Sequence, residues 1–116
     1  MMLLIVGCSY RTAPVEVRER LAFGQDRLLP ALDQLVAHCH CEAIILSTCN
    51  RIELYLARDD GGEGPDSVAI NQYLSGFHRV AIRDFSSCLY EHRQADAIAA
   101  YESSHPAPIN TLQESH

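Results

Sequence analysis

The chain has 116 residues and a formal net charge of −6, from nine arginines, no lysine and fifteen acidic side chains. This acidic balance excludes a protein that coats nucleic acid through clustered positive charge, although a local arginine patch can still contact RNA. No stretch approaches the ~20 apolar residues of a membrane span, and the apolar start has no basic flank before it, so we expect a cytoplasmic protein without a membrane partner.

The first half of the chain predicts a strand followed by two helices. Leu3–Gly7 (LLIVG) is a short apolar run ended by glycine, which is typical of a buried strand. Val15–Phe23 predicts a short amphipathic helix, and Pro14 suits its first position. A second helix is expected from about Arg27 to Ala37, with Asp26 as its N-cap.

The second half predicts a hairpin, a helix and a last strand. Glu42–Ser47 and Ile52–Ala57 are strand-like segments separated by a four-residue turn, which indicates an antiparallel hairpin. Ser67–Phe77 predicts a helix with Val68 in its apolar stripe. Cys88–Glu91 predicts a short strand.

This order of elements predicts an α+β domain, in which a small, mainly antiparallel sheet carries helices on one face in a ferredoxin-like arrangement. A domain of this size can bury about two-thirds of its unfolded surface and needs no disulfide or metal to fold. We expect it to span residues 1–100. Residues 101–116 lose periodicity and carry prolines and polar residues, which predicts a divergent, disordered tail.

Cys49 is the first candidate for chemistry, because it falls at the expected hairpin tip, two residues from Arg51. A nearby guanidinium and the N–H groups of a turn favour the thiolate, which is the form that attacks carbonyl groups. The alternative is a small core residue, as cysteine often is. Five cysteines in a reducing compartment are expected as free thiols, and Cys8 and Cys88 are interpreted as packing residues at strand ends.

Other titratable groups favour structural interpretations. His38–Cys41 (HCHC) is spaced too closely for one ion, so we interpret it as a helix end and expect no metal. His78 and His92 are candidate acid–base groups, with a solvated surface position as the alternative. The acidic loop Asp59–Asp66 is interpreted as solvated. No GxGxxG or P-loop pattern occurs, so no dinucleotide site is expected.

Two segments resemble signatures of the glutamyl-tRNA reductase family. Val6–Phe23 (VGCSYRTAPVEVRERLAF) is similar to the family's opening pattern, and Leu46–Tyr55 (LSTCNRIELY) is similar to its active-site pattern. A weaker match is Leu89–His92 (LYEH), and the resemblance runs from about Leu3 to Ala97. It implies the N-terminal catalytic domain of an NADPH-dependent oxidoreductase of porphyrin (tetrapyrrole) biosynthesis.

The resemblance implies a mechanism and its residues. Cys49 would attack the ester carbonyl of glutamyl-tRNA, and NADPH would reduce the resulting thioester to glutamate-1-semialdehyde. Thr48, Asn50 and Arg51 would hold the substrate, with Arg51 gripping the glutamate side-chain carboxylate. The family enzyme is a homodimer, and glutamate-1-semialdehyde aminomutase is a further partner. We expect no NADPH to bind this chain alone, because the family's NADPH and dimerising regions are absent from it.

The sequence also departs from the family pattern. Tyr10 replaces the usual histidine of the first motif, and Ala100 stands where the family has its active-site histidine. The residues that follow leave the family sequence, which predicts a natural truncation or a frameshifted end. The alternative function is a degenerate, non-catalytic paralogue that binds glutamyl-tRNA or a pathway partner. Ala100 favours that alternative, whereas the intact run Ser47–Glu53 favours the enzyme.

Overall fold

The computed structural model describes residues 2–58 and 66–93. Its strands and helices are β1 (Met2–Ser9), α1 (Val15–Leu21), α2 (Leu28–Cys39), β2 (Glu42–Ser47), β3 (Arg51–Arg58), α3 (Ser67–His78) and β4 (Tyr90–Arg93). Short 3-10 helices cover Gln25–Arg27, Ile82–Asp84 and Ser86–Cys88. No helix in this described part is long and apolar enough to cross a bilayer.

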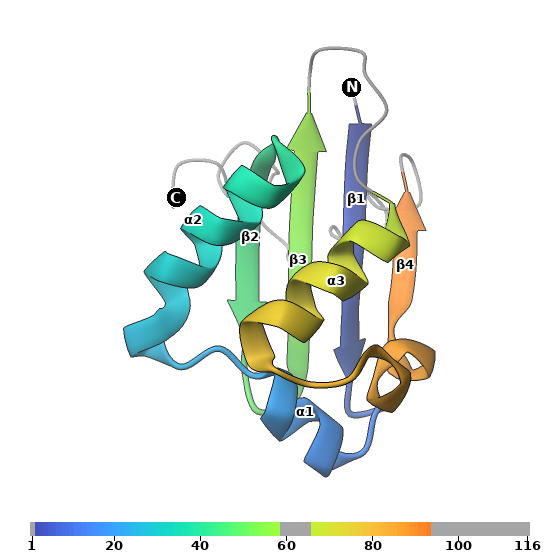
Figure 1. The fold of residues 1–116 in the computed structure, drawn as a ribbon. Coiled ribbons are helices and arrows are strands. Elements are labelled where there is room, and N and C mark those ends of the chain that lie inside the picture. The colour runs from blue at the N-terminus through green and yellow to red at the C-terminus, as the bar shows by residue number, and fades with distance from the viewer. Residues whose placement is uncertain (1, 59–65, 94–116) are drawn as a thin grey trace.

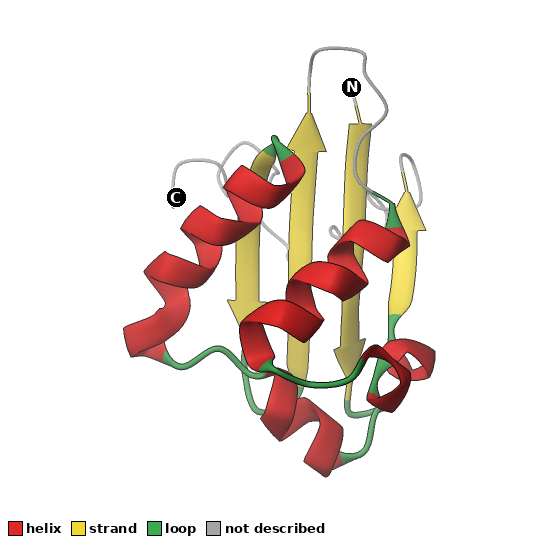
Figure 2. Cartoon of the chain, in the orientation of Figure 1, coloured by secondary structure: helices red, strands yellow, loops and turns green. Residues whose placement is uncertain are grey.

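The four strands form one sheet in the order β2-β3-β1-β4, and every neighbouring pair is antiparallel (Figure 1). The central pair is β1 and β3, which run in register from Met2 opposite Arg58 to Ser9 opposite Arg51. The helices α2 and α3 lie across one face of the sheet, and α1 lies at the end of the central strands (Figure 2). The predicted α+β, ferredoxin-like arrangement is therefore confirmed.

The main core lies between the sheet and the helices. Because side chains alternate along a strand, one set from each central strand points to the helices, namely Leu4, Val6, Cys8, Ile52, Leu54 and Leu56. The helices add apolar residues that are almost completely buried, including Leu21, Ala31, Leu35, Ile70 and Leu74. Each large side chain buried here contributes about 1.5–3 kcal/mol. On the opposite face, Ile5 and Tyr55 form a second, smaller cluster.

The connection between α1 and α2 differs from the prediction. The helix expected to reach Phe23 ends at Leu21, because Ala22 is extended (φ −68, ψ 144) and brings Phe23 into the core. The prediction that Asp26 caps α2 is wrong. Asp26 lies inside the 3-10 turn Gln25–Arg27, which leads directly into the helix.

The start of α3 adds a capping residue and corrects one prediction. Asp66 is exposed, in agreement with its interpretation as a solvated acid, and it is also the N-cap of this helix, since its carboxylate accepts a hydrogen bond from the N–H of Ala69 at 3.0 Å. Val68 does not join the buried stripe and is 58% exposed. It lies two residues from the buried Ile70, which places it on nearly the opposite side of the helix.

The last strand begins at Tyr90, two residues later than predicted. Ser86–Cys88 forms a 3-10 turn next to Phe85, which is fully buried. Cys88 is therefore a half-buried turn residue packed against the core, while Cys8 is buried as expected. The predictions for the acidic loop up to residue 65 and for the tail beyond residue 100 lie outside the described residues.

His78 is a partly buried histidine, so its interpretation as a solvated surface residue is wrong. Its ring lies 4.5 Å from the ring of Phe23 and 5.2 Å from that of Phe77, centroid to centroid. Its Nε2 has no hydrogen-bond partner in the structure. Burial, and then the positive charge of Arg27, lower the pKa of His78 to about 4. His78 is therefore neutral at pH 7.

Acid sensitivity should depend on this histidine. Unfolded His78 titrates near 6.5 and the folded residue at about 4, so the unfolded state binds more protons between these values, and stability falls as the pH drops through this window. His78→Phe should flatten the dependence of unfolding free energy on pH between 6.5 and 4, measured by urea denaturation. His40→Asn, at an exposed left-handed position that asparagine tolerates, is the control. Equal slopes in wild type and His78→Phe would contradict this account.

Candidate active site at the tip of the β2–β3 hairpin

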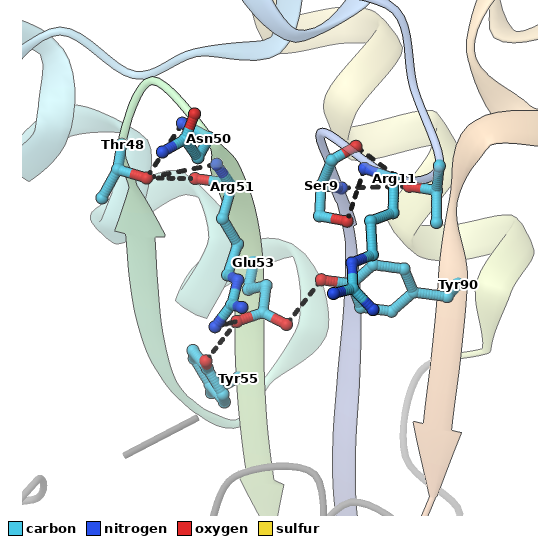
Figure 3. A network of polar contacts seen from close by, with 9 residues as sticks. Ser9, Arg11, Thr48, Asn50, Arg51, Glu53, Tyr55 and Tyr90 are labelled. Carbon is cyan, nitrogen blue, oxygen red and sulfur yellow. Dashed lines mark hydrogen bonds and ion pairs between the residues drawn. The ribbon is translucent and has the colours of Figure 1, made fainter. Parts of the chain in front are cut away.

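Two turns meet at one end of the central strands. The first follows β1 and starts at Ser9, and the second joins β2 to β3 through Thr48–Asn50. The N–H of Tyr10 donates to the carbonyl oxygen of Asn50 at 2.9 Å, just beyond the pair formed by Ser9 and Arg51. This bond extends the β1–β3 ladder into the turns. Figure 3 shows both turns, with Ser9 and Arg11 in one and Thr48 and Asn50 in the other.

Thr48 organises the hairpin turn. Its hydroxyl oxygen accepts hydrogen bonds from the N–H of Asn50 at 3.3 Å and from that of Arg51 at 3.1 Å, and its own N–H donates to the carbonyl of Arg51 at 2.8 Å. A threonine hydroxyl that binds nearby backbone N–H groups in this way stabilises a tight turn. The apex of the turn is left to Cys49 and Asn50, as predicted.

Cys49 is exposed, so the alternative interpretation of this cysteine as a core residue is wrong. The other thiols are less accessible, being buried at Cys8, Cys39 and Cys41 and half-buried at Cys88. A reagent or substrate that approaches the folded domain therefore meets the sulfur of Cys49 first.

Arg18, on α1, forms hydrogen bonds to the backbone of both turns. Its Nη1 donates to the carbonyl of Ala13 at 2.7 Å and its Nε donates to the carbonyl of Cys49 at 3.3 Å. We predicted from the sequence that the guanidinium near Cys49 is that of Arg51. This guanidinium instead lies along β3 towards Glu53 (Figure 3). The role of Arg18 was missed, although this residue belongs to the first signature segment.

The turn after β1 is stabilised from within. The N–H of Ser9 donates to the hydroxyl of Thr12 at 3.0 Å, and the N–H of Arg11 donates to the hydroxyl of Ser9 at 3.2 Å. Tyr10 projects outwards with 57% of its surface exposed, and its hydroxyl accepts a bond from Nε of Arg11 at 3.1 Å. The turn after β1 thus carries an exposed aromatic ring paired with a guanidinium.

A carboxylate buried on the helix-free face of the sheet was not anticipated as a site residue. Glu53 is 5% exposed, and its two oxygens accept hydrogen bonds from the hydroxyls of Tyr55 at 2.5 Å and Tyr90 at 2.6 Å. Arg51 approaches the same carboxylate, with Nη1 at 3.8 Å from Oε1. Burial, together with the hydrogen bond to Glu53, raises the pKa of both tyrosines well above the usual value. The hydroxyls therefore stay protonated donors.

The remaining candidates lie away from the hairpin tip. The interpretation of His38–Cys41 as a helix end is confirmed, since α2 ends at Cys39 and His40 takes the left-handed conformation (φ 54). Over residues 2–58 and 66–93, no group of three or more histidine, cysteine or acidic side chains could hold a metal ion. His92 is half-buried, with its ring 5.5 Å from that of Tyr90.

Comparisons with known proteins agree on one family. Residues 6–101 match the family described as "Glutamyl-tRNAGlu reductase, N-terminal domain". Over 99 residues the chain is 46% identical to the glutamyl-tRNA reductase of Marinobacter nauticus, 39% to that of Pseudoalteromonas translucida and 38% to that of Shewanella piezotolerans. These matches cover 84% of this chain but only 22–23% of each relative. The chain thus spans less than a quarter of the length of these curated relatives.

Cys49 should be the most reactive of the five thiols, because it is the exposed one. Brief treatment of the folded protein with iodoacetamide, followed by peptide mass spectrometry, should find the label mainly at Cys49. The same treatment in concentrated urea is the control and should label all five. Faster labelling at Cys8, Cys39, Cys41 or Cys88 in the folded protein would show that the tip does not present its thiol.

Proposed function

Because the chain belongs to the glutamyl-tRNA reductase family, we propose that Cys49 is its nucleophile and attacks the ester that joins glutamate to its tRNA. The observation that carries this proposal is the exposure of Cys49 at the apex of a doubly fixed turn. A nucleophile must be accessible and also held in place, since misplacement of the reacting atoms is costly to the rate. The hairpin tip meets both requirements.

The proposed chemistry is acyl transfer to sulfur. The thiolate of Cys49 forms a bond to the ester carbonyl carbon, the carbon–oxygen bond to the terminal ribose breaks, and the released ribose oxygen takes up a proton. A glutamyl thioester on Cys49 and free tRNA result. Splitting the reaction through a covalent intermediate replaces one difficult step by two easier ones.

The thioester would next be reduced to glutamate-1-semialdehyde, which is the oxidoreductase step of porphyrin biosynthesis. We propose that the full-length family enzyme carries out this reduction. NADPH supplies the hydride there. The described residues do not fit this cofactor, because their sheet is antiparallel and offers no Gly-rich turn between a parallel strand and a helix. We therefore assign the acyl-transfer half of the reaction to this chain. A homodimer and an aminomutase partner remain predictions from the resemblance, and a cytoplasmic location remains a prediction from the sequence.

Substrate recognition is proposed for Arg51, with Thr48 and Asn50 at the same turn. The side chain of Arg51 is 35% exposed and lies on the helix-free face, so its fork of N–H groups can receive the side-chain carboxylate of glutamate. Glutamine lacks that charge and would leave the guanidinium unsatisfied. Thr48 shapes the turn through its hydroxyl, and Asn50 lies exposed beside Cys49.

Slow deacylation of glutamyl-tRNA is the activity expected of this chain. Water should take the thioester, releasing glutamate and no semialdehyde. Ala100, which lies outside the described residues, stands where the family has its active-site histidine. The absence of that histidine should slow the reaction, because a general acid–base group is worth ~10²–10⁴ in rate. Cys49→Ser should abolish release of labelled glutamate from charged tRNA. Arg51→Ala should lower kcat/KM at least about tenfold and relax discrimination against glutaminyl-tRNA.

The matched control is Cys88→Ser, which removes a thiol from a half-buried turn and should leave the rate unchanged. Equal deacylation by wild type and Cys49→Ser would mean that this thiol performs no chemistry. The non-catalytic interpretation, a module that binds glutamyl-tRNA without turnover, would then replace the proposal.

A further inference from the structure

Glu53 is a buried charged residue that has no role in the proposed acyl transfer. It is the charged side chain with the lowest exposure in the described part of the chain, at 5%, and it lies on the helix-free face among apolar and aromatic neighbours. A buried carboxylate is costly unless its oxygens are satisfied by hydrogen bonds. The presence of a buried carboxylate beside Arg51 therefore needs an explanation.

The contacts of Glu53 match the ionised carboxylate. Each oxygen receives one phenolic hydroxyl, from Tyr55 on the same strand and from Tyr90 on β4, at 2.5 and 2.6 Å. These lengths are typical of charge-assisted O–H···O⁻ bonds. The tyrosines thus hold a negative charge at a fixed point and disperse it.

Arg51 is the cation that this charge attracts. Glu53 and Arg51 are two residues apart on β3, so their side chains lie on the same face of the sheet (Figure 3). The separation of 3.8 Å between Nη1 and Oε1 exceeds a hydrogen-bond length. The attraction therefore orients the guanidinium without saturating its N–H groups. They stay available to a second carboxylate.

Gly7 makes room for this arrangement. A Cβ added at Gly7 would lie 2.8 Å from Cγ of Glu53 and 2.3 Å from the carbonyl oxygen of Ile52. Any other residue at this position would force the β3 backbone or the side chain of Glu53 to shift. The backbone of β1 is thus shaped to seat the carboxylate.

We propose that Glu53 is a positioning residue that determines specificity: clamped by Tyr55 and Tyr90, it holds the Arg51 guanidinium ready for the side-chain carboxylate of the substrate. The proposal deepens the proposed function and rests on it for the identity of the substrate. Without Glu53, Arg51 would sample many rotamers, and the substrate would have to order the side chain at the cost of its entropy. Preference for glutamate over glutamine should then decline.

The positioning is measured without any reaction, by the NMR signal of the Arg51 Nε–H group, assigned through its loss in Arg51→Ala. In wild type this signal should be resolved from those of the solvated arginines. Glu53→Gln, which keeps the shape of the side chain and removes its charge, should merge it with them. Tyr90→Phe should shift the Arg51 Nε–H signal part of the way towards those of the solvated arginines. This variant replaces Glu53→Gln in the test if Glu53→Gln fails to fold. Glu91→Gln, which breaks the exposed pair of Glu91 with Arg93, should leave it in place.

Specificity is measured in Cys49→Ser protein, in which no turnover occurs, by titration with the 1-methyl esters of glutamate and glutamine. The preference for the glutamate ester should fall about tenfold when Glu53→Gln is added. An unchanged Arg51 signal, or an unchanged preference, in Glu53→Gln would overturn the proposal. Absence of any preference in Cys49→Ser alone would overturn the Arg51 grip of the proposed function, whereas the Nε–H signal would still report whether Glu53 orders Arg51.

Discussion

The pairing of β1 with β3 is the interaction on which the candidate site depends. These strands are far apart in sequence, yet they pair over their whole length, and the bond from Tyr10 to Asn50 continues the pairing into the turns. The first signature segment contributes the end of β1 and the turn after it, and the second contributes the hairpin turn and the start of β3. A change that shifted the register by one residue would move Arg51 and Glu53 to the helix face and separate the turns.

The same pairing concentrates positive charge in an acidic protein. Arg11 comes from the turn after β1, Arg18 from the helix that follows it, and Arg51 from the start of β3, so the pairing brings three arginines to the same end of the sheet, where Arg18 contacts the hairpin tip. An anionic substrate can therefore be attracted locally although the net charge is −6. The site also divides its tasks, because Thr48 and Arg18 fix the backbone of the turn while Arg51 keeps a partly free guanidinium.

Much of this architecture could be predicted from the sequence, because its signals are local. The alternation in Ile52–Ala57 and the short turn before it predicted the hairpin and the exposed tip. The partners of Arg18, the burial of Glu53 and the course of the Arg51 side chain could not be predicted, since they depend on which strands and helices become neighbours. The capping role of Asp66 was also missed, because a carboxylate in an acidic run carries no signal that separates a helix cap from a merely solvated charge.

The central claim, that the hairpin tip presents Cys49 for acyl transfer, is tested most directly by trapping the intermediate. The protein would be mixed with glutamyl-tRNA, quenched in acid and digested, and the cysteine peptides analysed by mass spectrometry. The account predicts one glutamyl group on Cys49, bound as a thioester and removed by neutral hydroxylamine. Deacylation of the tRNA with no acyl group on Cys49, or with the group on another cysteine, would contradict it.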